Sequence, residues 1–257
     1  MTGKKTKVIS EGVWGELLNQ QVPLLLQAKT IRKEEKIGLV IVDIVNGFAT
    51  TGAGSMAPQQ PNHQIAQMVA KANDLAKLFC GQNRPILAFL DTHHPEQQEY
   101  PYPSHCVVGT GEEDLVPALK WLEQEKSVTL IRKDCINGFI GAYDHSGNNQ
   151  LLGWVKQQQL QELLVIGICT DICVMDLVLT LLSARNHGML GKVDKIWVYE
   201  KGCSTFDLPR AEVEEKKLPL HLCHPQQLTH HMGLYFMASR GAQLLGTVKM
   251  EPSYNFG

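Results

Sequence analysis

Cys173 combines a reactive atom with a place in the sequence that could activate it. It closes the segment C-T-D-I-C (169–173), which follows an apolar run and precedes a stretch with helical spacing. The first N–H groups of a helix lack intrahelical partners and carry partial positive charge, so a thiol there has a lowered pKa. A nearby lysine would lower it further, and an aspartate could accept the thiol proton. The alternative interpretation is a buried cysteine in an apolar helix, the commoner role of this residue type.

Three charged residues follow other apolar runs and could join this thiol. Asp43 ends G-L-V-I-V-D, Asp91 ends P-I-L-A-F-L-D, and Lys133 follows S-V-T-L-I-R. If these runs are parallel strands, their carboxyl ends meet at the edge of the sheet where ligands bind. Asp43 could instead cap a loop, and Lys133 could be a solvated turn residue. Their joint placement with Cys173 predicts a catalytic set of acid, lysine and thiol.

A second set of side chains has the composition of a metal site. Asp91 and His93 stand in D-T-H, and His105 follows in Y-P-Y-P-S-H-C. One carboxylate oxygen and two imidazole nitrogens suit Zn, Fe or Mn and leave positions open for water or a ligand. Glu99 lies between them and is a candidate fourth ligand, whereas His94 should point the opposite way. The D-x-H pattern alone is a weak signal, and the alternative is a polar surface loop.

Four further histidines near the carboxyl-terminal end also look metal-like: His221, His224, His230 and His231. They follow no apolar run that predicts a strand. We therefore interpret them as the polar start and the solvated face of a helix, and not as a second metal site.

The chain that must position these residues alternates apolar runs with helical periodicity. Predicted strands cover 38–43, 85–91, 127–132, 162–168, 195–200 and 242–248. Predicted helices cover 62–80, 112–123, 149–158, 172–187 and 224–238. Near-continuous apolar strands separated by helices indicate an α/β fold with a doubly wound, mostly parallel sheet and helices on both faces.

Residues 12–30 precede this pattern and are expected to form an extra helix interrupted at Pro23. No repeat, low-complexity tract or long linker divides the rest of the chain. We therefore expect an N-terminal helical extension over 1–35 and a single domain over 36–257 that includes a C-terminal extension.

The composition is that of a soluble globular protein and excludes several function classes. Of 257 residues, 44% are hydrophobic and 19% are charged, and the formal net charge is −2. The sequence lacks the block of basic residues that is typical of nucleic-acid-binding proteins, so a nucleic-acid partner is not expected. Its apolar runs are too short to cross a membrane. The first residues lack the apolar core of a signal peptide and the seven cysteines are scattered, so we expect a cytoplasmic protein.

The nucleophile segment resembles that of the isochorismatase-like cysteine hydrolases, a family whose resemblance covers roughly residues 36–210. G-I-C-T-D-I-C-V is similar to the family motif that carries the nucleophile, which implies Cys173. The resemblance also implies a cis peptide before Cys169 and an oxyanion hole formed by the backbone N–H groups of Cys169 and Cys173. Lys133 matches the lysine of the family's catalytic triad.

The first motif and one aromatic residue extend the resemblance. V-D-I-V-N-G-F is similar to the family motif that implies Asp43 as the catalytic acid/base and Phe48 as a wall of the substrate pocket. The family usually has a second acid just before this phenylalanine, where this chain has Gly47. Tyr102 matches an aromatic residue near the metal-binding histidine and would pack on the substrate ring.

The D-x-H pair followed by H-C-V is similar to the metal-binding set of the nicotinamidases within this family, and Y-P-Y-P-S-H-C resembles the plant enzymes. The resemblance implies one divalent transition metal, with Zn favoured over Fe or Mn, held by Asp91, His93 and His105 and by Glu99 as the candidate fourth ligand. The implied reaction, a step of NAD salvage, hydrolyses the small carboxamide nicotinamide to nicotinate and ammonia through a cysteine thioester. A homo-oligomer is expected.

Three alternatives remain. One is a metal-free hydrolase of the same family acting on another small amide or an N-carbamoyl compound, which would keep its activity when metal is removed. Another is a non-catalytic relative that keeps the fold for binding, which the intact Asp43, Lys133 and Cys173 disfavour. A redox protein is disfavoured because Cys169 and Cys173 have C-x-x-x-C rather than C-x-x-C spacing.

Overall fold

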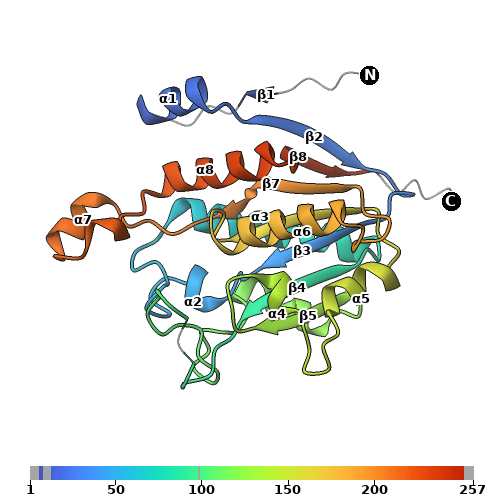
Figure 1. Ribbon diagram of the computed structural model, residues 1–257, viewed down its shortest axis with the longest axis horizontal. Coiled ribbons are helices and arrows are strands. Elements are labelled where there is room, and N and C mark those ends of the chain that lie inside the picture. Colours follow the sequence, from blue (N-terminus) through green and yellow to red (C-terminus); the bar gives the residue numbers. More distant parts are fainter. Residues whose placement is uncertain (1–5, 8–12, 98, 252–257) are drawn as a thin grey trace.

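The computed structural model describes residues 6–7, 13–97 and 99–251, and its centre is an eight-stranded sheet in the order β1-β2-β8-β7-β6-β3-β4-β5 (Figure 1). The strands are β1 (Thr6–Lys7), β2 (Leu25–Ile31), β3 (Ile37–Val42), β4 (Ile86–Asp91), β5 (Val128–Lys133), β6 (Glu162–Ile168), β7 (Lys195–Ser204) and β8 (Gln243–Met250). Every pair except β1–β2 is parallel. The predicted doubly wound, mostly parallel sheet is therefore confirmed.

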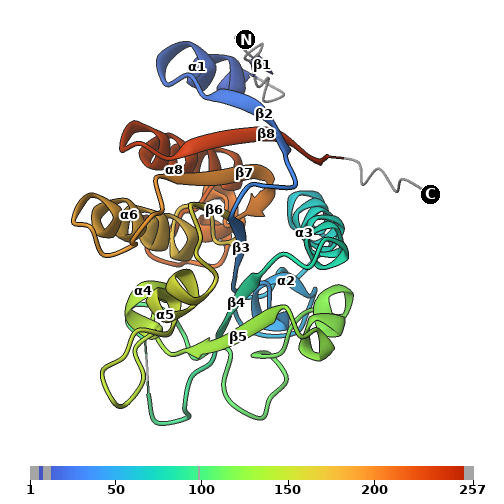
Figure 2. The same ribbon diagram turned by 90° about the vertical axis from the view of Figure 1, so that its right-hand side faces the viewer.

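Helices cover both faces of this sheet, as Figure 2 shows. The helices are α1 (Val13–Gln21), α2 (Asn46–Ala49), α3 (His63–Gly81), η1 (Pro117–Gln124), α4 (Gly138–Gly141), α5 (Gln150–Gln157), α6 (Cys173–Asn186), α7 (Arg210–Glu215), η2 (Leu220–Leu222) and α8 (Gln226–Ser239). Helices α3 and η1 bury one apolar face, whereas α5, α6 and α8 bury the other. Among the described residues, none of the helices has the length and apolar character needed to cross a bilayer.

The chain reverses its direction of winding between β3 and β6, which lie side by side at the middle of the sheet. Val42 pairs with Gly167 near the carboxyl ends of these strands. A Cβ atom at Gly167 would lie 2.1 Å from Val42 O, and its φ is 139°, so only glycine fits. This close approach brings the residues after β3 and β6 together at the switch point, where open α/β sheets bind their ligands.

The predicted N-terminal helix is correct only in its first half. Helix α1 ends at Gln21, and residues Leu25–Ile31 form β2, which pairs in parallel with β8. Pro23 cannot continue the helical hydrogen-bond pattern, and the edge of β8 offers the following residues a ladder of backbone partners. Pairing across the sheet outweighs the helix propensity of this leucine-rich segment.

The predicted helix over 112–123 is also shorter than expected, because regular structure starts only at Pro117 and is 3₁₀. The Glu113 carboxylate accepts hydrogen bonds from the N–H groups of Gly109, at 2.6 Å, and Gly111, at 2.9 Å. These bonds hold the preceding segment as a loop, which competes with helix formation.

Candidate functional site

Three strand ends deliver two carboxylates and one lysine to a single buried point. Lys133 Nζ lies 2.9 Å from Asp43 Oδ2 and 2.7 Å from Asp91 Oδ1. Asp91 and Lys133 are paired neighbours at the ends of β4 and β5, and Asp43 follows the last residue of β3. The lysine thus links the predicted acid to a predicted metal ligand, a contact that the sequence alone does not reveal.

Asp43 has an environment suited to proton transfer. It is fully buried and has a φ of 53°, in the left-handed region that aspartate tolerates better than most residues. Its Oδ1 has no nitrogen or oxygen donor among the described residues. Burial raises the pKa of Asp43 to about 7, against the opposing charge of Lys133. A carboxyl group with this pKa can both accept and return a proton near neutral pH.

Cys173 is the first residue of α6, and its thiol lies close enough to Lys133 and Asp43 for both charges to act on it. The residue is only 8% exposed. Burial raises the pKa of Cys173 well above its ordinary value, although Lys133 acts in the opposite direction. The expectation of a lowered pKa at the helix start is therefore wrong for the free protein, because the loss of solvent outweighs the positive charge.

The turn before Cys173 is folded back on itself. The peptide bond between Ile168 and Cys169 is cis, as the family resemblance predicts. The N–H groups of Ile172 and Val174 both donate to Cys169 O at 3.1 Å. This brings Cys169 next to the helix start, where the Cys173 N–H has no intrahelical acceptor. The two predicted oxyanion donors therefore lie on one turn.

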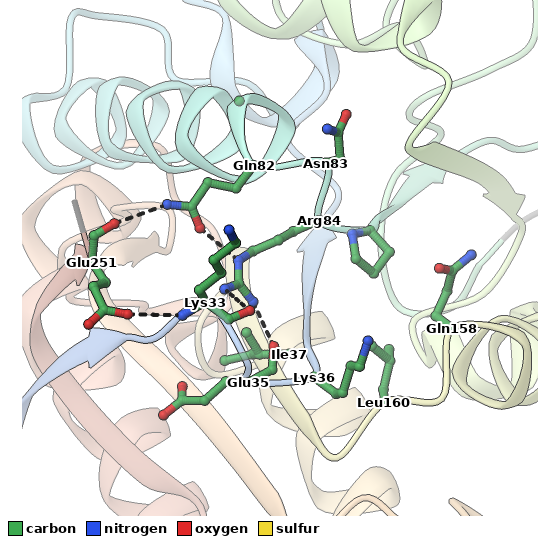
Figure 3. A pocket seen from close by; sticks show the side chains of 12 residues that line it. Lys33, Glu35, Lys36, Ile37, Gln82, Asn83, Arg84, Gln158, Leu160 and Glu251 are labelled. Carbon is green, nitrogen blue, oxygen red and sulfur yellow. Dashed lines mark hydrogen bonds between the residues drawn. The ribbon is translucent and has the colours of Figure 1, made fainter. Parts of the chain in front are cut away.

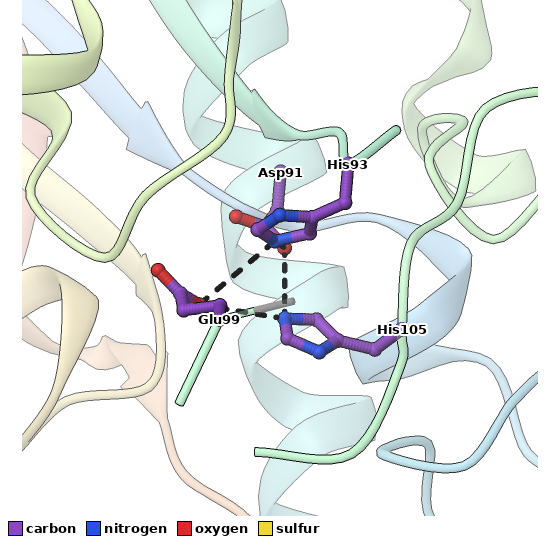
Figure 4. Close-up of side chains that lie close together, drawn as sticks. All are labelled: Asp91, His93, Glu99 and His105. Atoms are coloured by element: carbon purple, nitrogen blue, oxygen red, sulfur yellow. Dashed lines mark hydrogen bonds and ion pairs between the residues drawn. The ribbon is translucent and has the colours of Figure 1, made fainter. Parts of the chain in front are cut away.

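The four predicted metal ligands also converge. Asp91, His93, Glu99 and His105 each direct one donor atom toward a common point, and these atoms lie within 4.8 Å of one another (Figure 4). Asp91 Oδ2 is 2.9 Å from His93 Nε2 and 3.2 Å from His105 Nε2. Glu99 Oε2 is 3.8 Å from His93 Nε2 and 3.6 Å from His105 Nε2. These side chains could hold one metal ion.

The spacing and the orientation of these donors fit a divalent ion. Zinc bonds of about 2.0–2.1 Å in a tetrahedron separate ligand atoms by about 3.3 Å, and the four distances from a carboxylate oxygen to an imidazole nitrogen run from 2.9 to 3.8 Å. His105 Nδ1 donates to Pro103 O at 2.7 Å, which leaves Nε2 as the ligand atom. Burial alone would lower the pKa of His105, but hydrogen bonds with Asp91 and Glu99 raise it to about 10. A metal cation would replace the proton that these carboxylates attract.

Both predicted aromatic residues lie beside the metal-ligand group. The Phe48 ring centroid is 5.5 Å from that of His105, and the Tyr102 centroid is 6.2 Å from it. Burial, followed by the charges of Cys173 and Cys169, raises the pKa of Tyr102 to about 12. Tyr102 therefore lies beside His105 and within electrostatic range of the thiol.

The structure explains the glycine that replaces the family's second acid. A Cβ atom at Gly47 would lie 2.7 Å from Cys106 Sγ and 3.1 Å from Glu112 Cβ. The Glu112 carboxylate accepts the Cys106 N–H at 2.9 Å, next to His105. The sequence analysis did not identify Glu112. The adjacent acids Glu112 and Glu113 in G-T-G-E-E-D are the feature that could have drawn attention to it.

The carboxyl-terminal histidines are not the solvated face that the sequence analysis predicts. His230 and His231 are buried, His224 is half-buried, and only His221 is exposed. His224 contacts Asp171 and His230 contacts Thr170, both in the turn before Cys173. These partners leave no signal in the sequence, because they lie more than fifty residues away along the chain.

Comparison with known proteins finds one family and several proteins of similar fold. The Isochorismatase domain model matches residues 38–220. Nicotinamidase 1 of Arabidopsis thaliana is 50% identical over 234 residues, which are 91% of this chain and 93% of that protein. The crystal structure of nicotinamidase PncA from Bacillus subtilis is 21% identical, with a TM-score of 0.60, over 81% of this chain and 98% of that one. Pyrazinamidase of Pyrococcus horikoshii in complex with zinc is 17% identical, with a TM-score of 0.57, over 82% of this chain and 98% of that one.

Proposed function

The chain belongs to the isochorismatase domain family, and from that premise we propose that it is a nicotinamidase, which hydrolyses nicotinamide to nicotinate and ammonia. The main support is the convergence of Lys133 on both Asp43 and Asp91, because it joins an acid–thiol pair to a metal-ligand group. The 50% identity with a plant nicotinamidase, over 91% of this chain, supports the substrate.

In the first step, Asp43 accepts the proton of the Cys173 thiol, and the thiolate attacks the carboxamide carbon. Lys133 offsets the negative charge that the pair carries during this transfer. The backbone N–H groups of Cys169 and Cys173 stabilise the oxyanion, and each such donor contributes about 3 kcal/mol in comparable sites.

Collapse of the tetrahedral intermediate breaks the C–N bond, and Asp43 returns its proton to the departing ammonia. The remaining thioester on Cys173 is then hydrolysed by a water molecule, with Asp43 again accepting a proton. Nicotinate leaves, and the thiol is restored. One carboxyl group can serve in both directions because its pKa of about 7 lies near the working pH.

The metal-ligand group defines where the substrate ring binds. We propose that Asp91, His93, His105 and Glu99 hold one zinc ion, which when bound supplies a Lewis-acidic partner for the pyridine nitrogen. Phe48 and Tyr102 pack against the ring and exclude water from it. Lys133 keeps Asp91 ionised as a ligand while it contacts Asp43.

Ammonia release from nicotinamide by the purified protein, with and without a chelator, tests this function. We expect turnover that is lost on chelation and restored by zinc. Metal content should fall from about one equivalent to near zero in a His93→Ala, His105→Ala double variant, whereas exposed His94→Ala should keep its metal. Turnover that survives complete metal removal would instead support a metal-free amidase of the same family.

A further inference from the structure

The turn that carries the nucleophile is held from outside by a histidine in the segment between η2 and α8. His224 Nε2 lies 2.8 Å from Asp171 Oδ2, and Asp171 stands midway between Cys169 and Cys173. The two residues are fifty-three positions apart in the chain. We propose that His224 is a positioning residue for the nucleophile turn (residues 169–173), acting through Asp171; the proposal rests on the hydrolase function proposed above.

Besides its contact with Asp171, His224 has several other contacts that fix its position. Its ring stacks on Phe206 with centroids 3.7 Å apart and an interplanar angle of 11°. Its Nδ1 donates to Phe206 O at 3.0 Å, so the other nitrogen is aimed at the Asp171 carboxylate. Its backbone exchanges two hydrogen bonds with Leu208, at 2.7 and 2.9 Å. A ring held in this way can transmit a fixed geometry to its partner.

Asp171 places a largely buried carboxylate in the turn that carries Cys173, and such a group needs a partner to stay ionised. Burial opposes ionisation of Asp171, but the hydrogen bond and the charge of His224 outweigh it and lower the pKa of Asp171. Burial and then the Asp171 charge raise the pKa of Cys169 to about 12, so the Asp171 carboxylate acts electrostatically on another residue of the turn. Without the His224 contact, the carboxylate would lose the hydrogen bond and the charge that hold it ionised and in place.

The neighbouring residue of the turn is held by the same helix region. Thr170 Oγ1 lies 2.7 Å from His230 Nδ1, and burial lowers the pKa of His230 to about 4, so this ring is neutral near pH 7. The Thr170 N–H donates to Ser204 O at 2.8 Å. The turn is therefore held at Thr170 by hydrogen bonds to neutral groups. The Asp171–His224 contact holds it at a second residue, one position nearer to Cys173, through a charged carboxylate.

Two substitutions separate the two contacts of His224. The amide nitrogen of asparagine lies close to the position of Nδ1, whereas that of glutamine lies close to the position of Nε2. His224→Asn therefore keeps the bond to Phe206 O and loses the contact with Asp171, and His224→Gln does the reverse. If His224 positions the turn, His224→Asn should lower kcat on nicotinamide about 10- to 100-fold with KM within about threefold, since the substrate ring is bound elsewhere. His224→Gln should keep kcat within about threefold.

The matched variants make the outcome readable. In an Asp171→Asn background, His224→Asn should cause no further loss of kcat, because both act through one contact. Exposed His221→Ala, in the adjacent turn, should leave kcat unchanged.

Alkylation of Cys173 by iodoacetamide needs no substrate, and it should slow in His224→Asn and not in His224→Gln. Equal kcat values and equal alkylation rates for the two His224 variants would overturn the proposal. A wild-type protein that releases no ammonia from nicotinamide would overturn the proposed function, and the alkylation rates would then test His224 independently.

Discussion

The two edges of the parallel sheet both bury charged side chains, but they pair those charges to different degrees. At the carboxyl edge, Lys133 is shared by Asp43 and Asp91, and one oxygen of Asp43 has no nitrogen or oxygen donor among the described residues. At the amino edge, the Arg84 guanidinium is surrounded by acceptors. The comparison separates buried charge that can do chemistry from buried charge that stabilises the fold.

Arg84 precedes β4 and ties the loop between β2 and β3 to its own segment at the amino edge. It donates to Glu35 O at 2.7 Å, to Arg32 O at 2.6 Å and to Gln82 Oε1 at 3.0 Å. Figure 3 shows Arg84 in the middle of this network, which lines a surface pocket of about 330 Å³. Each of these guanidinium donors has an acceptor at hydrogen-bond distance, so few N–H groups of Arg84 are left to bind a substrate.

Glu162 anchors the neighbouring part of the same edge. Its carboxylate accepts from Trp197 Nε1 at 2.6 Å and pairs with Lys29 Nζ at 2.9 Å. Burial opposes ionisation, but the hydrogen bonds of Lys29 and Trp197 outweigh it, so the pKa of Glu162 is lowered. Asp43, buried with a shared lysine, has its pKa raised instead. The direction of the shift thus distinguishes Asp43 from Glu162. It also distinguishes Asp43 from Asp91, whose pKa is lowered at the same edge, against the effect of burial, by Lys133 and by hydrogen bonds from His105 and His93.

The largest expected effect is at the carboxyl edge. Cys173→Ala should abolish ammonia release, a loss of about 10⁴-fold or more, because no other group can form the thioester. The unfolding midpoint should change little, since a small side chain replaces a thiol. Cys169→Ala is the control and should lose far less activity, because the proposed mechanism uses only its backbone N–H. Substantial turnover in the Cys173 variant would remove the nucleophile assignment.

Lys133→Met tests the shared cation of the same edge. Lys133 lowers the pKa of Cys173 against the effect of burial, so its removal should raise that pKa further and move the alkylation profile to higher pH. Iodoacetamide modification of Cys173 at neutral pH should slow about 10- to 100-fold. Metal content is measured in parallel because Lys133 also contacts Asp91. Exposed Lys156→Met is the control; an unmoved profile in Lys133→Met would make Lys133 electrostatically irrelevant to the thiol.

Arg84→Met tests the amino edge, where we expect lost stability without lost chemistry. The substitution leaves backbone carbonyls without their donors, which should lower the free energy of unfolding by about 2–4 kcal/mol. Below the melting range, kcat should stay within about twofold, because Arg84 lies at the opposite end of β4 from Asp91. Arg32→Met is the control, since its side chain is 62% exposed and its ion pairs are weak. A large fall in kcat with unchanged stability would contradict the division between the edges.

The sequence predicts the carboxyl edge much better than the amino edge. Strand ends are readable because apolar runs stop at Asp43 and Asp91, and parallel strands must deliver these residues to one place. Arg84 gives no such signal, because its partners are backbone carbonyls, which exist at every position of a sequence. The contact of His224 with Asp171 is hidden for a related reason: it depends on how a distant loop returns to the sheet.

The prediction of the N-terminal segment failed for a further physical reason. Residues after Pro23 carry leucine, glutamine, alanine and lysine, which favour a helix in isolation. Strand β2 forms because β8 presents a free edge beside it, and edge pairing is a property of the assembled sheet. Local propensity therefore predicted the helix to Gln21 and could not predict the strand that comes after it.

The smallest expected effect is found by comparing how much stability is lost when either of the two lysines paired with Glu162 is replaced. Lys195 Nζ lies 3.1 Å from Glu162 Oε1 with a side chain that is 41% exposed, whereas Lys29 Nζ lies 2.9 Å from Oε2 and is 9% exposed. Lys29 also lies over the Trp197 ring, 4.8 Å from its centroid. Water and salt screen the exposed pair, so Lys195→Met should cost about 0.5 kcal/mol or less, and the cost should shrink as salt rises. Lys29→Met leaves Glu162 short of its buried partner and should cost about 3 kcal/mol with little salt dependence. Urea unfolding of both variants at low and high salt measures the contrast, and equal costs would show that burial does not set the strength of these amino-edge pairs.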